Sequence, residues 1–296
     1  MGMGMGMGMG MGMGMGLGLT GAFGGPVGFI LPDTLTGPEP DYDLYEKKTE
    51  RKFPLVNAVR FDDRCWDGRH LAQAVLGEFS SYPWQNDQTI IPKDWQINPK
   101  FNLDQEIRIL IGLGRTNRMT RGEEILAQAE DATPYWANLL MTNPVACPAT
   151  WLLVHIGEAV GMMVSMYFKR MFRRPRPVQV YPALMPLLLS PPHASFPNAH
   201  ALQSFLMSRL LAKVRLDVKP QLDALAMRVA VNREIAGVHY PSDRVASMGM
   251  IDGIMAIFDL LEKENPKGAY ASILARAGLE WPDILVAATP QHNHHP

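Results

Sequence analysis

Residues 195–205, SFPNAHALQSF, place a histidine in the first turn of an expected helix. Pro197 and Asn198 fit the entrance of this helix, and the apolar residues that follow His200 fit its body. A helix N-terminus carries partial positive charge, which disfavours a protonated imidazole and favours a bound anion. His200 is therefore a candidate to serve an anion, and other parts of the sequence should supply cations for that anion.

Two basic residues lie on otherwise apolar faces of expected helices. Lys169 ends a stripe that steps by three and four from Leu152, and Arg233 ends a similar stripe from Leu222. A buried cation needs a partner, and an anion in the core would provide one. A structural interpretation stays open for both residues: Lys169 could extend to solvent, and Arg233 could pair with a carboxylate such as Glu158.

A third cation follows in KRMFRRPRPVQVYP, residues 169–182. Arg176 stands between two prolines, which fix φ and cannot continue a helix interior, so this segment can aim a guanidinium at a fixed point. The planar guanidinium donates two parallel hydrogen bonds, which suits a tetrahedral oxyanion. We expect the neighbouring Arg173 and Arg174 to face solvent.

These residues fall in three motifs that resemble the signature of the type 2 phosphatidic acid phosphatase superfamily. That superfamily includes soluble bacterial acid phosphatases, membrane lipid phosphatases and vanadium-dependent haloperoxidases, and its usual motifs are K-x6-RP, PSGH and SR-x5-H-x3-D. The corresponding motifs here are Lys169-x6-Arg176-Pro177, Pro197-Asn198-Ala199-His200 and Arg233-x5-His239-x3-Asp243. The resemblance covers residues 169–243 and implies an all-α fold.

Three positions depart from the usual motifs. Asn198 replaces the serine and Ala199 the glycine of the second motif, and Asn232 replaces the serine before Arg233. Asparagine is a good N-cap, so the Asn198 side chain either caps its helix or turns its amide toward the anion. The Ala199 methyl group narrows the approach to the backbone N–H, but we expect the pocket to be retained.

The resemblance implies a role for each matched residue. Lys169, Arg176 and Arg233 would hold the anion, together with Asn198 and Ala199 at the helix N-terminus. His239 would attack phosphorus, Asp243 would orient the His239 ring, and His200 would protonate the leaving oxygen and then activate water. The implied activity is that of an acid phosphatase, which hydrolyses phosphate monoesters through a phosphohistidine and requires no cofactor.

Two alternative functions remain. In a vanadium-dependent haloperoxidase, vanadate would be the cofactor on His239 and Lys169 would polarise bound peroxide. His193 resembles the histidine on the halide side of some haloperoxidase pockets, whereas Met166 stands where some of them carry an aromatic residue. The other alternative is a self-assembling structural protein with a residual oxyanion pocket, which the replacements at Asn198 and Ala199 motivate.

The sequence predicts four regions. Residues 1–30 form a Met/Gly-rich low-complexity tail, either disordered or an assembly element through which a homo-oligomer could form. Residues 31–102 form an irregular lead-in with one helix near 68–79, residues 103–285 the helical catalytic domain, and residues 286–296 a flexible tail. Apolar residues recur at helical spacing without strand alternation, so the predicted fold is an all-α helical bundle, with helices near 104–113, 120–141, 150–172, 198–215, 219–236, 242–263 and 268–279.

Charge and composition narrow the partners and the location. Because 28 basic residues balance 29 acidic ones, we expect no nucleic acid as a partner. The resemblance implies a small phosphate or vanadate oxyanion as the partner instead. The two cysteines show no metal-type spacing, although one disulfide stays open. The apolar runs 151–168 and 245–261 carry ionisable residues, so we interpret them as buried helices and expect no transmembrane span. Since no standard signal peptide precedes them, we expect a soluble protein, with the cytoplasm favoured over atypical export.

Overall fold

The computed structural model describes residue 61, residues 66–93 and residues 102–282. From Trp66 onward these residues belong to one compact unit. The predicted tails at 1–30 and 286–296, and most of the lead-in before residue 66, lie outside the described residues. Helices without any strand make up the described part of the chain, which confirms the all-α prediction.

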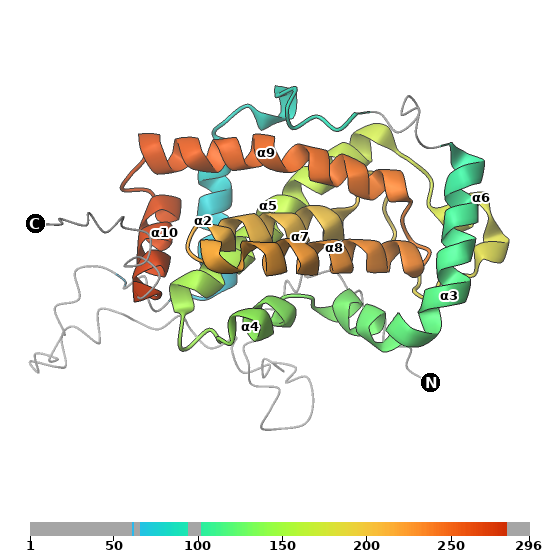
Figure 1. Ribbon diagram of the computed structural model, residues 1–296. Helices are drawn as coiled ribbons and strands as arrows, with labels where there is room; N and C mark the ends of the chain where they lie inside the picture. The colour runs from blue at the N-terminus through green and yellow to red at the C-terminus, as the bar shows by residue number, and fades with distance from the viewer. Residues whose placement is uncertain (1–60, 62–65, 94–101, 283–296) are drawn as a thin grey trace, which may run out of the picture. The chain divides into compact units, whose positions relative to one another are not determined.

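The helices follow one another in the order shown in Figure 1. They are α2 (Gly68–Ser80), α3 (Leu103–Glu130), α4 (Pro134–Leu140), α5 (Pro148–Phe172), α6 (Pro177–Val180), α7 (Ala199–Ala212), α8 (Lys219–Ile235), α9 (Pro241–Glu264) and α10 (Ala269–Leu279). Short 3-10 turns lie at η3 (Trp84–Asn86), η5 (Pro182–Leu184) and η6 (Leu216–Val218).

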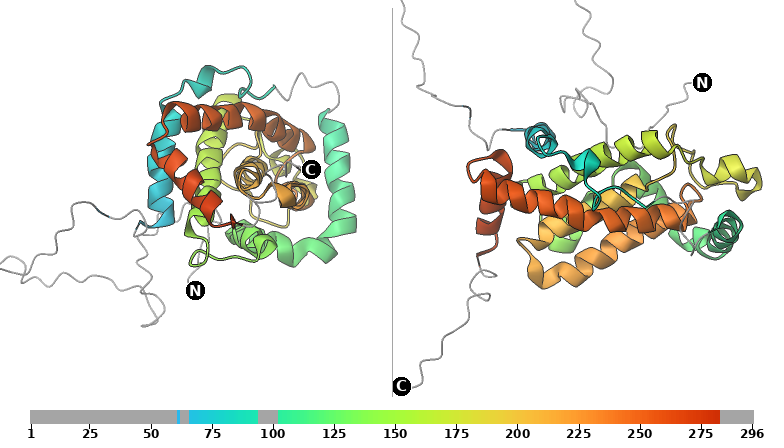
Figure 2. Two further views of the ribbon diagram at one scale, coloured as in Figure 1. Left: turned by 60° about the vertical axis from the view of Figure 1, so that its left-hand side comes forward. Right: turned by 90° about the horizontal axis from the view of Figure 1, so that it is seen from above.

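Helix α7 is the central element of this unit. Nearly all of its residues are buried, and its apolar residues are spread around the helix rather than gathered on one face, as expected for a helix enclosed by others. Figure 2 shows α7 and α8 viewed nearly end-on, with α5, α9 and the other helices around them. The main core is built from apolar side chains of α2, α5, α7, α8, α9 and α10. The N-terminus of α7, which carries His200, is therefore fixed by neighbours on every side.

Helix α3 differs from the prediction of separate helices at 104–113 and 120–141. It runs without interruption to Glu130, because no proline lies between Gly114 and Thr120 and the three internal glycines are tolerated. Thr120 does not cap a helix, since its hydroxyl donates to the Asn117 carbonyl within α3. The break falls where the Asp131 carboxylate accepts two hydrogen bonds from Thr133, just before α4 begins. The other predicted helices are found with small shifts at their ends.

Two glycines bring α5 directly against α7. A Cβ atom at Gly157 would lie 2.7 Å from the Met207 backbone nitrogen, and one at Gly161 would lie 2.9 Å from the Gln203 Cα. The two helices therefore touch through their backbones, without side chains between them. This contact sets the position of His200 at the start of α7 relative to the C-terminal end of α5.

Replacing Gly157 with alanine should destabilise the protein by about 1–3 kcal/mol, because an added methyl group would force α5 and α7 apart. This loss should exceed the gain of up to about 1 kcal/mol from the better helix propensity of alanine. Gly77→Ala is the matched control, since Gly77 is exposed and an added Cβ would meet nothing within 4 Å. Denaturant unfolding measures both variants. Equal stabilities would contradict the close contact.

Candidate functional site

The three predicted motifs meet at one end of the helical unit, where α5 and α8 end and α7 and α9 begin. The Asn198 backbone N–H donates to the Asp243 carbonyl at 3.2 Å, which joins the starts of α7 and α9. Helix N-termini present unpaired N–H groups and partial positive charge. The arrangement thus directs two helix N-termini, together with the predicted cations, toward one region.

His239 and Asp243 form a buried hydrogen-bonded pair. The His239 Nδ1 lies 2.9 Å from Asp243 Oδ2, and the same oxygen accepts hydrogen bonds from the Ser195 hydroxyl at 2.6 Å and the Tyr240 N–H at 3.0 Å. The spacing of four residues works because His239 precedes α9 and Asp243 lies in its first turn. With the proton on Nδ1 facing the carboxylate, Nε2 carries the lone pair.

Arg176 lies between two histidines. Its Nη1 lies 3.0 Å from His239 Nε2 and donates to the Val238 carbonyl at 2.6 Å. Its Nη2 lies 3.0 Å from His193 Nδ1, and its Nε donates to the His193 carbonyl at 3.0 Å. The proline-flanked segment therefore holds the guanidinium against Nε2 of His239, the ring nitrogen that faces away from Asp243.

Lys169 and Arg233 are both buried, and neither makes the purely structural contact that the sequence left open for it. Lys169 is 2% exposed, so it does not extend to solvent, and its Nζ donates to the carbonyls of Ala194 and Ser195 at 2.9 and 2.8 Å. Arg233 does not pair with Glu158: its Nη2 donates to the Ile125 carbonyl at 3.0 Å and to Gln128 Oε1 at 3.3 Å. Both cations are held within the protein, which leaves positive charge in the interior.

Two of the buried donors that have no acceptor in the described part of the chain belong to this site. Asn198 Oδ1 caps α7 by accepting from the Ala201 N–H at 3.2 Å, so its Nδ2 remains and is unpaired. Arg233 Nε is likewise buried and unpaired. Leaving such groups without an acceptor costs about 1–3 kcal/mol each, so a bound oxyanion would offset a real penalty. Asn198 thus caps the helix with one atom and keeps the other available, while Ala199 is buried beside it.

Burial and neighbouring cations keep the histidines of this region neutral. Burial is the main cause that lowers the pKa of His200 well below its ordinary value, and the charges of Arg233, Lys169 and Arg176 lower it further. Burial and Arg176 lower the pKa of His239 in the same way, although its bond to Asp243 acts in the opposite direction. Burial and the charges of Lys169 and Arg176 lower the pKa of His193 to about 4. The histidines therefore add no positive charge of their own to this region, and burial and the charge of Arg176 also lower the pKa of Lys169.

Two further residues of this region were not predicted correctly from the sequence. The expectation that Arg174 faces solvent is wrong, since it is 2% exposed and donates to Asp243 Oδ1 at 2.7 Å and to Glu106 Oε2 at 2.6 Å. Glu106 was missed, although it lies one helical turn before the buried Leu110, by the same spacing that singled out Lys169. Arg173 is exposed as expected.

The remaining predicted residue, Met166, lies one turn before Lys169 on α5 and is half-buried, and its place in the pocket stays a prediction. No group of three or more His, Cys, Asp or Glu that could hold a metal ion occurs among the described residues. Vanadate on His239 likewise stays a prediction.

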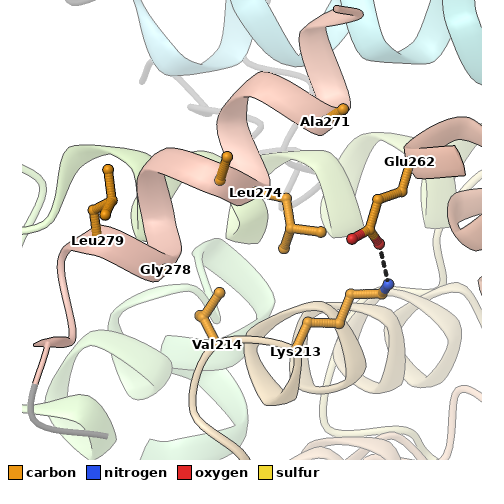
Figure 3. Close-up of a pocket in the computed structure, with 8 residues that line it drawn as sticks. Lys213, Val214, Glu262, Ala271, Leu274, Gly278 and Leu279 are labelled. Carbon is orange, nitrogen blue, oxygen red and sulfur yellow. Dashed lines mark hydrogen bonds and ion pairs between the residues drawn. The ribbon is translucent and has the colours of Figure 1, made fainter. Parts of the chain in front are cut away.

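A surface hollow of about 380 Å³ lies away from this region, beside the end of α7 and against α10 (Figure 3). Its cation, Lys213, is already paired with Asp259 at 2.7 Å and Glu262 at 2.8 Å. None of the predicted site residues lines it. This hollow therefore offers no second oxyanion site.

Comparison with known proteins identifies phosphatases. No family model matches the chain. It is 31% identical over 127 residues, or 42% of this chain and 70% of the relative, to decaprenylphosphoryl-5-phosphoribose phosphatase of Mycobacterium tuberculosis. It is 32% identical over 135 residues, or 45% of this chain and 72% of the relative, to the protein of the same name from Mycolicibacterium smegmatis. A solved transmembrane PAP2 type phosphatidylglycerolphosphate phosphatase from Bacillus subtilis matches with TM-score 0.34 and 17% identity, covering 66% of this chain and 92% of that chain.

The expectations of no transmembrane span and of a soluble cytoplasmic protein are wrong. Residues Pro148–Val180 are long and apolar enough to cross a membrane, with a mean hydropathy of 1.4 and 61% of the apolar window buried inside the protein. This run was interpreted as a buried helix because it carries the ionisable residues His155 and Glu158. These side chains lie 3.6 Å apart, and such pairing makes ionisable groups less costly in an apolar run.

The neutral histidines predict that the protein loses stability in acid. Their pKa values lie below the ordinary 6.5, so the unfolded chain binds more protons once the pH falls below about 6.5. Stability should therefore be complete above about pH 6.5 and should fall by up to about 2 kcal/mol per buried histidine at about pH 5. Denaturant unfolding at about pH 7.5 and about pH 5 measures this loss.

His200→Gln should reduce this acid sensitivity, whereas replacement of the exposed His70 by glutamine should leave it unchanged. The same loss in the wild type and in His200→Gln would show that the His200 imidazole is not held neutral in the folded protein.

Proposed function

Because this chain belongs to the type 2 phosphatidic acid phosphatase superfamily, we propose that it hydrolyses a lipid-linked phosphate monoester through a phosphohistidine intermediate. Phosphatase activity itself follows from the family and from relatives that are named as phosphatases. The observation that carries the proposed mechanism is the geometry of His239: its Nδ1 lies 2.9 Å from the Asp243 carboxylate, and its Nε2 lies 3.0 Å from the Arg176 guanidinium.

In the first step, His239 Nε2 attacks the phosphorus atom of the bound monoester. A P–N bond forms and the ester P–O bond breaks, while positive charge that develops on the imidazole is stabilised by Asp243. Arg176, Arg233 and Lys169 oppose the negative charge on the phosphoryl oxygens, which is the main electrostatic demand of phosphoryl transfer. The unpaired Nδ2 of Asn198 is a further donor for these oxygens.

His200 transfers protons in this proposal. Its pKa is lowered by burial and by the surrounding cations, so a bound phosphate dianion, which offsets those charges, raises the pKa and favours the protonated form. The protonated ring gives its proton to the leaving oxygen. The neutral ring then takes a proton from water as the water oxygen attacks phosphorus. The P–N bond breaks, and inorganic phosphate and neutral His239 result.

An apolar rim beside the site supports the proposed lipid-linked substrate. The segment 180–189 joins the turn that carries Arg176 to the segment that carries His193, and it exposes Met185 (75%) and Leu189 (95%) together with Val180, Tyr181 and Leu187. Arg118 fixes this segment, since its Nη1 donates to the Met185 carbonyl at 2.7 Å and its Nε to the Ile235 carbonyl at 3.0 Å. A lipid chain would cover apolar surface next to the bound phosphate. The relatives' names specify a decaprenyl-linked phosphoribose.

His239→Ala should lower kcat by on the order of 10³-fold or more, because it removes the attacking nitrogen. The substrates are p-nitrophenyl phosphate and a short polyprenyl-linked phosphoribose phosphate, and released phosphate is measured. In His200→Ala, reactions with radiolabelled substrate quenched in alkaline detergent, which preserves the acid-labile P–N bond, should show label bound to the protein, because water activation is slow. Label that persists in the His200→Ala, His239→Ala double variant would contradict attack by His239.

Replacing Met185 and Leu189 with serine should raise KM for the polyprenyl-linked substrate by roughly tenfold or more, because apolar contact of about 1.5–3 kcal/mol per side chain is lost. Kinetics with p-nitrophenyl phosphate should not change, since that substrate has no lipid chain. Val145→Ser is the control, because Val145 is equally exposed but lies before the N-terminus of α5, at the opposite end of that helix from Lys169. An equal effect on both substrates would argue against the rim as a lipid contact.

A further inference from the structure

A buried chain of ionic contacts leads from α3 to the proposed nucleophile. Glu106 Oε2 accepts from Arg174 Nη2 at 2.6 Å, and Arg174 Nη1 donates to Asp243 Oδ1 at 2.7 Å. Asp243 Oδ2 in turn lies 2.9 Å from His239 Nδ1. All four side chains are buried. Glu106 belongs to none of the three motifs and lies more than 60 residues before the first of them, at Lys169.

Ser242 closes this chain into a network. Its hydroxyl donates to Glu106 Oε1 at 2.6 Å and accepts from Arg174 Nη1 at 2.6 Å, and its backbone N–H donates to Glu106 Oε1 at 2.8 Å. Glu106 thereby binds the first turn of α9, which contains Asp243. A buried ion pair is favourable only when such additional hydrogen bonds satisfy its members. This network meets that condition at both Glu106 oxygens.

The two oxygens of the Asp243 carboxylate bind different partners, and this fixes the orientation of the carboxylate. Oδ1 binds Arg174, while Oδ2 binds His239, Ser195 and the Tyr240 N–H. The carboxylate therefore cannot rotate without losing contacts on both sides. The Arg174 guanidinium also lies over the Tyr240 ring, 3.8 Å from its centroid, which fixes the guanidinium plane. Without a second anion, Arg174 would direct both of its Nη atoms to Asp243 and compete with His239 for the carboxylate.

We propose that Glu106 and Arg174 are positioning residues that hold the Asp243 carboxylate in the orientation that fixes His239. Arg174 occupies the oxygen that His239 does not use, and Glu106 binds the other Nη atom of Arg174. Helix α3 thus completes the site from outside the three motifs. The kinetic part of the test below rests on the proposed hydrolysis, and the spectroscopic part does not.

Glu106→Gln and Arg174→Met should each lower kcat on p-nitrophenyl phosphate by on the order of 10- to 100-fold, as is typical when a partner that orients a site residue is lost. KM should change little, because neither residue touches the substrate. Arg174→Lys should recover part of kcat, since an ammonium keeps one contact but cannot bridge both carboxylates. Asp104→Asn is the matched control: Asp104 lies in the same turn of α3 and forms an exposed pair with Arg108.

A double-mutant cycle separates positioning from general structural damage. If Glu106 acts through Asp243, Glu106→Gln should reduce kcat little further in an Asp243→Asn background. Multiplied losses in the double variant would overturn the proposal.

The imidazole ¹⁵N and ¹H NMR signals of His239 test the same idea without turnover. The wild type and Asp104→Asn should show a protected Nδ1–H, and Glu106→Gln and Arg174→Lys should each shift it or lose it. If the wild type shows this signal but no hydrolysis, the proposed function fails while positioning is still measured. An unchanged signal in Arg174→Lys, or in a folded Glu106→Gln variant, would overturn positioning.

Discussion

The buried carboxylate of Asp243 is the interaction on which the rest of this site depends. One of its oxygens caps the start of α9, orients His239 and binds Ser195, while the other pairs with Arg174. Burial alone would raise the pKa of Asp243, but the bond to His239 and the charge of Arg174 hold it below its ordinary value. The group therefore stays ionised where an isolated carboxylate would take up a proton. The turn before α7, the turn before α9 and the segment after α5 consequently share one anion as their common partner.

The same physical constraint explains the excess of positive charge. Asp243 and Glu106 oppose Arg174, but no carboxylate among the described residues is hydrogen-bonded to Lys169, Arg176 or Arg233. These three donate to carbonyl groups, to a glutamine or toward histidines, which satisfies N–H groups without cancelling charge. Buried charge of one sign is unfavourable in a low-dielectric interior. The rigid packing of α5 against α7 holds the charges in place despite this cost, and an oxyanion relieves it. In the proposed function, stability lost in assembling the site would be regained when a phosphate binds.

Local spacing predicted the helical fold and singled out Lys169 and Arg233, whereas His239 and Asp243 were assigned to the site by the resemblance to the family motifs. Apolar periodicity located α5, α7, α8, α9 and α10, and the cations on apolar faces were found by the same rule. The continuous α3 was not predicted, because Thr120 and Glu123 resemble a capping box that would begin a new helix. In the structure the Thr120 hydroxyl instead donates to the Asn117 carbonyl within α3. Arg174 was assigned to solvent because a pair of arginines after a helix usually faces water. Its partner Glu106 lies far away in sequence, and no local pattern connects the two. The apolar run of α5 was discounted as a span because it carries His155 and Glu158, although these residues are one helical turn apart and their side chains lie 3.6 Å from each other.

In the proposed reaction, the residues that local motifs reveal differ in role from the residues that are distant in sequence. Groups that would touch phosphate lie in short motifs, because the turn before a helix can place a donor and a histidine within a few residues. Groups that fix those motifs come from wherever the fold brings a neighbour, here the two ends of α3: Glu106 reaches the Asp243 side, and Gln128 reaches Arg233. Asn232, which replaces the usual serine, donates to the same Gln128 oxygen at 2.9 Å and to Glu124 at 2.9 Å. This replacement therefore extends a polar contact with α3 and leaves Arg233 buried in place. The departure at Asn232 thus adds contacts with α3, and the changed residue at this position is compatible with the proposed oxyanion site.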